Sequence, residues 1–162
     1  MNLCRTSGVE ETRRFAGAIA ELARAGDLVL LVGDLGTGKT AFAQGFAKAL
    51  GVDEQVTSPT FTLVRTYRGR LTLNHLDVYR LDRLQEADDL GLAELVDDGG
   101  VTLIEWGDAV RPALQPDYLE VRLAHATLEE DDDLRHLQLT VVGPSWAPRA
   151  EALSAALEAW SC

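Results

Sequence analysis

GDLGTGKT, residues 33–40, decides the fold, because it matches the phosphate-loop pattern G-x-x-x-x-G-K-[ST]. The apolar run LVLLV at residues 28–32 precedes it and predicts a buried strand. Apolar residues then recur at helical spacing as far as Leu50, and Gly51 predicts the end of that helix. A strand, a glycine-rich turn and a helix N-terminus form a cradle for anions, so we expect this chain to bind a nucleoside triphosphate.

The residues of this phosphate loop have distinct expected roles. Gly36 and Gly38 let the backbone approach the phosphates without Cβ clashes. Lys39 is expected to reach the β and γ phosphates, and the Thr40 hydroxyl is expected to bind Mg²⁺. Given this composition, the pattern arises by chance on the order of once in a thousand such chains, so we favour phosphate binding over an ordinary glycine-rich turn.

The composition is that of a globular protein and predicts one domain over residues 1–162. Hydrophobic residues make up 46% of the chain and charged residues 25%. The sequence has no apolar run as long as a membrane span and no signal-peptide core, so we expect a cytoplasmic protein without membrane contact. Cys4 and Cys162 stand near the two ends, which favours free thiols over a disulfide framework or a zinc site.

The net charge of −11 argues against direct binding of RNA or DNA. Nucleic-acid phosphates are held mainly by lysine and arginine, and the sequence contains no long basic run. Any contact with nucleic acid is therefore expected to be made by a partner.

Outside the phosphate loop, the residue pattern predicts alternating helices and strands. Ser7 and Glu10 have the spacing of a capping box for a helix that ends near Gly26. Alternating apolar residues over 61–67 and 71–76 predict a β-hairpin. Further expected elements are a helix over 84–95, a strand over 101–104, paired strands over 118–123 and 134–142 joined by the solvated acidic run 129–133, and a C-terminal helix starting at Pro148.

Two acidic residues directly follow predicted strands. Asp77 comes after an apolar strand that ends at Leu76, and Glu105 comes after residues 101–104. The carboxyl edge of a parallel sheet gathers ligands, and a nucleotide hydrolase needs an acid there for magnesium or its water. The alternative is that each acid simply faces water at the end of its strand.

Two further features are candidates for the same site. TSPTFT, residues 57–62, is a candidate sensor of the γ phosphate through Thr60, and the alternative is an ordinary Ser-Pro turn. Trp106 either belongs to the core, the commoner place for an aromatic residue, or lines the nucleotide pocket.

Four motifs in one order resemble the TsaE (YjeE) family: GDLGTGKT at 33–40, SPTFTLV at 58–64, HLDVYRL at 75–81 and IEWGD at 104–108. The resemblance covers essentially the whole chain. It implies a single-domain, P-loop NTPase-like α/β fold with a mixed central sheet, a parallel core, antiparallel hairpins and helices on both faces. The family is the ATPase subunit of the bacterial tRNA threonylcarbamoyladenosine machinery, so it implies ATP and Mg²⁺ as cofactors, TsaD-like and TsaB-like partners, and only indirect contact with tRNA.

The resemblance also implies roles for single residues. Thr40, Glu105 and Asp77 would serve magnesium, and Asp77, Thr60 and Lys39 would act in hydrolysis. Residues 6–11 would contribute to the adenine pocket, and the role of Arg135 stays open. The residues expected to hold the phosphates are Gly33, Gly36, Thr37, Gly38, Lys39, Thr40 and Ala41.

Three other functions are compatible with a phosphate loop. A small-molecule or nucleoside kinase needs a lid with arginines, for which Arg65, Arg68 and Arg70 are candidates, although the alternation predicts a hairpin there. A GTP-driven switch is disfavoured, because neither Asn2 nor Asn74, the only asparagines, begins an N-K-x-D motif. The third alternative is a module that binds nucleotide within a complex without hydrolysing it.

Overall fold

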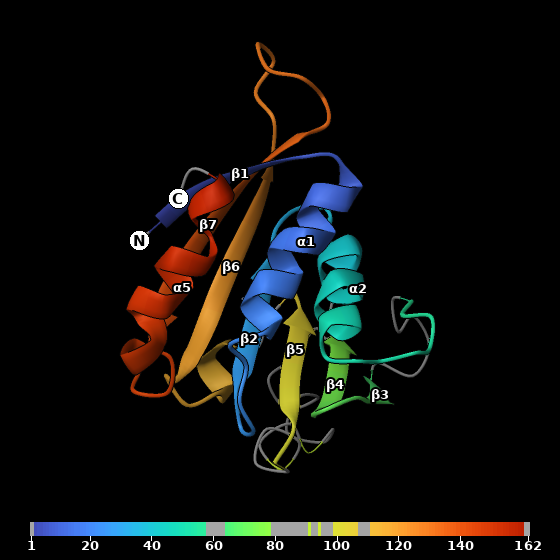
Figure 1. Ribbon diagram of the computed structural model, residues 1–162, viewed down its shortest axis with the longest axis vertical. Coiled ribbons are helices and arrows are strands. Elements are labelled where there is room, and N and C mark those ends of the chain that lie inside the picture. Colours follow the sequence, from blue (N-terminus) through green and yellow to red (C-terminus); the bar gives the residue numbers. More distant parts are fainter. Residues whose placement is uncertain are drawn as a thin grey trace.

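The computed structural model describes residues 2–57, 64–78, 91, 94, 99–106 and 111–160. Within these residues the chain forms a seven-stranded sheet with the order β1-β7-β6-β2-β5-β4-β3 (Figure 1). Its strands are β1 (Asn2–Ser7), β2 (Leu28–Val32), β3 (Val64–Arg68), β4 (Thr72–Asp77), β5 (Val101–Glu105), β6 (Tyr118–His125) and β7 (Leu134–Val142). Its helices are α1 (Val9–Ala20), α2 (Lys39–Ala49) and α5 (Ala150–Ala156), with short 3-10 helices η2 (Arg111–Ala113), η3 (Ala147–Arg149) and η4 (Glu158–Trp160).

The centre of the sheet is parallel and its margins are antiparallel. Strands β6, β2, β5 and β4 run parallel to one another. Strand β7 pairs antiparallel with both β6 and β1, and β3 pairs antiparallel with β4. All five residues of β2 and of β5 are buried, which explains the continuous apolar run of β2 and the mainly apolar sequence of β5. The arrangement confirms the predicted mixed sheet, and it brings the ends of β2, β4 and β5 to one edge.

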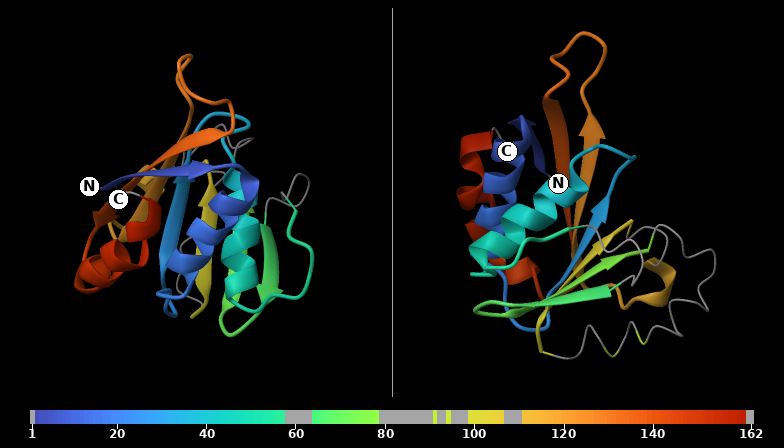
Figure 2. Two further views of the ribbon diagram at one scale, coloured as in Figure 1. Left: turned by 45° about the horizontal axis from the view of Figure 1, so that its top comes forward. Right: turned by 90° about the vertical axis from the view of Figure 1, so that its right-hand side faces the viewer.

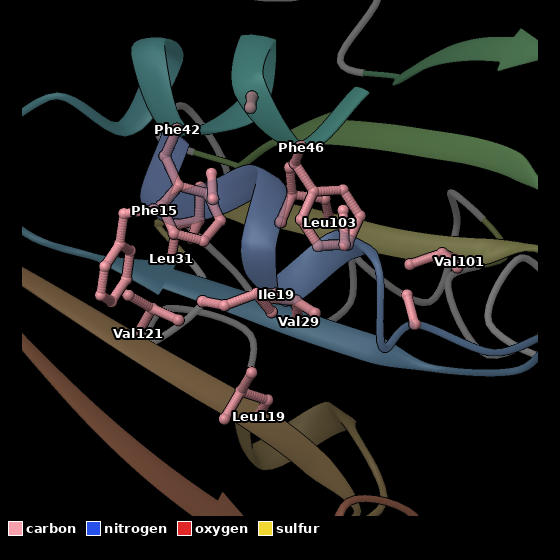
Figure 3. Packing of buried hydrophobic residues seen from close by; sticks show 14 of the residues in the cluster. Phe15, Ile19, Val29, Leu31, Phe42, Phe46, Val101, Leu103, Leu119 and Val121 are labelled. Atoms are coloured by element: carbon pink, nitrogen blue, oxygen red, sulfur yellow. The ribbon is translucent and has the colours of Figure 1, made fainter. Parts of the chain in front are cut away.

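Helices α1, α2 and α5 cover one face of the sheet, and η2 lies on the other (Figure 2, right). On the helical face, Phe15, Phe42 and Phe46 pack against strand residues such as Leu31 and Leu103 (Figure 3). Truncating a buried aromatic side chain of this kind typically costs about 3–5 kcal/mol of stability. Gly45 lets α1 and α2 approach closely, because a Cβ at this position would lie 2.1 Å from the carbonyl oxygen of Arg13. The helical layer therefore holds α2, and with it the phosphate loop, against the sheet.

Most predicted elements are found where they were expected. The hairpin is β3 and β4, with Val64 paired to Leu76 and Arg68 paired to Thr72. The acidic run connects β6 to β7 at the tip of a second hairpin, as predicted. Pro148 lies in η3, which leads directly into α5, and Trp160 packs edge-on against Phe15 at 5.4 Å between ring centroids. The predicted helix over 84–95 lies outside the described residues except for positions 91 and 94.

The N-terminus departs from the prediction. Residues 2–7 form the edge strand β1, which was not predicted, so Ser7 ends a strand and Gly8 takes the N-cap of α1. The expected capping box is therefore wrong: the Ser7 N–H donates to the Glu11 carboxylate at 2.7 Å, and no side chain among the described residues caps this helix. Helix α1 ends at Ala20, well before Gly26.

The expectation of free thiols is wrong for Cys4, which is fully buried and disulfide-bonded. Strand β1 lies against η4 near the other end of the chain, so residues far apart in sequence meet there. Cys162 lies outside the described residues. Among the described helices, none combines the length and apolar character needed to cross a membrane.

Candidate functional site at the carboxyl edge of the sheet

The phosphate loop joins the end of β2 to Lys39, the first residue of α2. Gly36 and Gly38 have φ values of 79° and 105°, in the left-handed region that glycine adopts without Cβ strain. A Cβ at Gly33 would lie 2.4 Å from the Leu123 carbonyl oxygen, so close packing requires this glycine too. No described side chain caps α2 at Gly38, which leaves the first N–H groups of the helix available to an anion.

A cavity of about 260 Å³ lies where this loop meets the ends of β4 and β5. The parallel register of the two strands pairs Asp77 with Glu105, so the two predicted acids are neighbours. Glu105 is only 3% exposed, which excludes for this residue the alternative of a carboxylate that simply faces water. The cavity is lined by Leu35, Gly36, Gly38, Lys39, Thr40, Asp77, Glu105 and Trp106.

The Lys39 ammonium is held inside its own loop. Its Nζ donates to the carbonyl oxygens of Gly33 at 2.6 Å and Asp34 at 2.8 Å, and it lies 3.9 Å from the centroid of the Trp106 ring. The lysine is 5% exposed. A cation with partners on several sides and little contact with water is a strong electrostatic feature of this cavity.

Trp106 satisfies both alternatives considered from sequence. It packs against a small apolar cluster that contains Leu76 and Ile104, and it also lines the cavity. Its φ of 63° is unusual for a bulky residue, and such a conformation costs of order 1–3 kcal/mol. Backbone strain of this kind, next to a cavity lined with charges, is typical of functional sites.

Sequence reasoning missed His75, whose Nε2 lies 2.6 Å from Oε2 of Glu105. His75 is fully buried in β4, on the same face of the strand as Asp77. A histidine two positions before the acid, on the same face of the strand, was the available signal.

A second hollow, of about 100 Å³, lies on the other side of the phosphate loop. It brings the N-terminal residues Gly8, Val9 and Thr12 together with Arg135 of β7. Thr37 and Ala41, two of the expected phosphate-binding residues, line this hollow rather than the first. The Gly8 N–H donates to the Asp133 carbonyl oxygen at 2.9 Å and so links the N-terminus to the β6–β7 hairpin.

A larger hollow, of about 560 Å³, lies elsewhere, between α1, α2 and residues 51–56. Its charged lining combines Glu10, Asp53 and Glu54 with Arg13 and Lys48, which does not favour a polyanion. We therefore place the candidate nucleotide site by chemistry rather than by volume. Thr60, the predicted sensor residue, lies outside the described residues.

The cavity of about 260 Å³ has a donor set that suits magnesium only when a bound ligand adds further oxygens. Among the described residues, no group of three or more His, Cys, Asp or Glu side chains is arranged to hold a metal. Magnesium characteristically uses one or two carboxylates together with substrate phosphates and waters. The hydroxyl of Thr40 and the carboxylates of Asp77 and Glu105 fit that pattern.

Comparisons with known proteins establish the family. The model of the family described as "Threonylcarbamoyl adenosine biosynthesis protein TsaE" matches residues 6–135. The "tRNA threonylcarbamoyladenosine biosynthesis protein TsaE" of Bacillus subtilis is 41% identical over 151 residues, covering 93% of this chain and 92% of that protein. The protein of the same name from Treponema pallidum is 45% identical over 115 residues, covering 71% of this chain and 84% of that protein.

A solved structure agrees with this sequence similarity. The crystal structure of Bacillus subtilis YdiB superposes with a TM-score of 0.78 at 36% identity, covering 99% of this chain and 96% of that one. Similarity at this level, over nearly the full length of both chains, extends to the whole fold. The chain therefore belongs to the TsaE family.

Proposed function

We propose that this chain is the ATP-binding and ATP-hydrolysing subunit of an assembly that makes threonylcarbamoyladenosine in tRNA. The names of its relatives support the pathway. One observation carries the chemistry: Lys39 and Thr40 of the phosphate loop line the same cavity as Asp77 and Glu105. The phosphate loop, the Lys39 cation and the two acids meet in this cavity, and phosphoryl transfer to water requires groups of these kinds.

The phosphates of ATP would lie along the backbone N–H groups of residues 33–40. The N-terminus of α2 contributes roughly half a positive charge, and Lys39 contributes a full one. In this proposal the Lys39 ammonium leaves the carbonyl oxygens of Gly33 and Asp34 for the β and γ phosphates. The carbonyl oxygens and the proposed phosphate position both lie at the same short loop, so Lys39 would need only a small side-chain movement.

Thr40, Glu105 and Asp77 would hold magnesium or its waters, and Asp77 would orient the attacking water. Bound magnesium would neutralise charge on the β and γ phosphates. The hollow on the other side of the loop, between Thr12 and Arg135, is the proposed position for the nucleoside. Thr60 would sense the γ phosphate and pass its state to the partners.

We propose TsaD-like and TsaB-like proteins as the partners, and contact with tRNA only through them. A chain with a net charge of −11 has little capacity to displace counterions from a tRNA backbone. Hydrolysis would be weak in isolation and would support repeated turnover of the complex, as expected for a subunit that supplies energy rather than the modification chemistry.

Reconstituted threonylcarbamoyl transfer to tRNA tests this function, with each component omitted in turn. We expect repeated turnover only when this chain and hydrolysable ATP are both present. Full multiple-turnover modification without this chain, or tight tRNA binding by the chain alone, would contradict the proposal. Incubation with ATP and a panel of nucleosides tests the kinase alternative, which predicts a phosphorylated acceptor.

A further inference from the structure

We propose that His75 is a positioning residue that orients the Glu105 carboxylate for magnesium, an inference that rests on the proposed ATPase function. The two side chains lie on neighbouring strands, and their Nε2 and Oε2 atoms are 2.6 Å apart. His75 is fully buried and Glu105 is 3% exposed. A hydrogen bond to a carboxylate is stronger when water is excluded, so this contact holds both groups in place.

The buried surroundings of His75 determine which nitrogen carries the proton. Nδ1 is buried and has no hydrogen-bond partner in the described part of the chain. A proton on Nδ1 would be a buried donor without an acceptor, whereas a proton on Nε2 is accepted by Glu105. The geometry therefore assigns a hydrogen to Nε2, where the Glu105 carboxylate accepts it.

This bond selects one orientation of the carboxylate. Oε2 accepts from the histidine, so Oε1 is the oxygen left for a cation in the cavity that Glu105 shares with Asp77 and Thr40. A carboxylate already fixed by a rigid ring loses little rotamer freedom when the cation binds. The histidine thus acts through Glu105 and has no role of its own in the reaction.

Packing alone does not require a histidine at this position. Leu73 lies two residues earlier on the same face of β4, and His75 is paired with Leu103 of β5 and with Arg65 of β3. Leu73 and Leu103 are buried and apolar and Arg65 is exposed, so a leucine at position 75 would suit this position. The polar contact of His75 with Glu105 is therefore the feature that a purely structural residue would lack.

The tautomer is tested directly on the unmodified, nucleotide-free chain by nitrogen NMR of its histidines. His75→Gln identifies the His75 signals, since they disappear in this variant. We expect a protonated Nε2 and an unprotonated Nδ1 for His75. A His75 ring without a proton on Nε2 would overturn the proposal, and this result does not depend on nucleotide binding.

The consequence for magnesium is tested by titrating a non-hydrolysable ATP analogue with and without Mg²⁺. His75→Leu introduces an apolar side chain of similar size and removes the donor, so we expect the magnesium-dependent gain in affinity to fall about tenfold or more. Affinity without magnesium should change little. His75→Gln places an amide N–H near the position of Nε2 and should restore most of the gain, whereas His75→Asn is too short and should not.

The same titration separates the two proposals. Combining His75→Leu with Glu105→Gln should add no further loss of the magnesium effect if the histidine acts through Glu105. Magnesium-dependent affinity that is unchanged in His75→Leu would overturn the positioning role alone. Failure of the unmodified chain to bind the analogue at all would overturn the proposed function and, with it, this role.

Discussion

Two buried ionisable pairs stand at opposite ends of the central sheet, and they differ in how completely they are satisfied. Near the start of β2, Asp27 and Arg149 form two hydrogen bonds of 2.6 and 2.7 Å. Arg149 makes five hydrogen bonds in total, the others to carbonyl oxygens of Leu22 and Ser145, and lies 4.0 Å from the Trp146 ring centroid. At the other end, His75 meets Glu105 through one nitrogen, while its other nitrogen is buried without a partner among the described residues.

The difference separates a structural pair from one that we propose to be functional. Asp27–Arg149 joins the turn before β2 to the C-terminal helical segment and uses every N–H of the guanidinium, so it has no capacity left for a ligand. Glu105 lines a cavity that also contains Lys39, Thr40 and Asp77. Burial of charge therefore does not by itself indicate a functional site here. The proposal for Glu105 rests on its incomplete hydrogen bonding next to a cavity.

The largest expected effect is on stability and comes from the structural pair. Arg149→Met keeps an apolar stem near Trp146 but leaves the Asp27 carboxylate buried and unpaired, so we expect about 3–5 kcal/mol lower free energy of unfolding. Denaturant unfolding measures it. The double variant Asp27→Asn with Arg149→Met should lose less than the sum of the two single losses, and nucleotide affinity at temperatures where the protein is folded should not change.

Lys39→Ala should have the next largest effect, on binding rather than on stability. Removing the ammonium takes away a charge-assisted contact to the phosphates in a site with little water, which is worth about 2–4 kcal/mol. Equilibrium titration with a fluorescent ATP analogue measures the loss. Lys48→Ala is the matched control, because Lys48 is exposed in the hollow between α1 and α2. Equal affinity of Lys39→Ala and the parent would rule out the phosphate-loop assignment.

Glu105→Gln and Asp77→Asn should leave the fold intact and reduce ATP hydrolysis by about tenfold to hundredfold. Each substitution keeps the shape of the side chain and removes one negative charge next to the proposed magnesium. Hydrolysis is measured with the partners present, and circular dichroism checks the fold. Parent-like rates in both variants would mean that the two acids are only residues at strand ends.

The smallest effect is expected at a third pair, His136 and Glu130, on the exposed β6–β7 hairpin. The hydrogen bond from the Thr127 backbone and the one from His136 lower the pKa of Glu130 from 4.5 to about 2. Because the folded-state pKa is the lower one, this contribution to stability is complete above about pH 4.5 and is lost as the pH falls through 2. Glu130→Gln should therefore show a slightly smaller loss of stability than the parent between these values in acid unfolding experiments. An identical pH dependence would contradict the lowered pKa.

The sequence predicted the centre of the fold better than its margins. Residues 28–32 are apolar without interruption, and Val101, Leu103 and Ile104 make 101–104 mainly apolar, because parallel strands are buried on both faces. Both strands could therefore be inferred locally. Strand β1 was missed, since its sequence NLCRTS is short and polar and its place depends on pairing with β7, far along the chain. The capping box failed for the same reason, because pairing of Ser7 with Leu134 places Ser7 in the sheet.

The candidate site was predictable where its residues follow a motif and unpredictable where they meet through the fold. Lys39 and Thr40 are placed by the loop, and Asp77 and Glu105 by the rule that ligands gather at carboxyl edges. The contact of His75 with Glu105 depends on strand register, which no local pattern specifies. The positive φ of Trp106 and its ring over Lys39 likewise arise from tertiary packing.

A crystal structure of the chain with Mg²⁺ and a non-hydrolysable ATP analogue tests the central claim most directly. We predict the phosphates on the N–H groups of residues 33–40, Lys39 Nζ moved from the carbonyl oxygens of Gly33 and Asp34 to the phosphates, and magnesium near Thr40 and Glu105. A nucleotide bound instead in the larger hollow between α1 and α2, or magnesium bound away from both Glu105 and Asp77, would contradict this account.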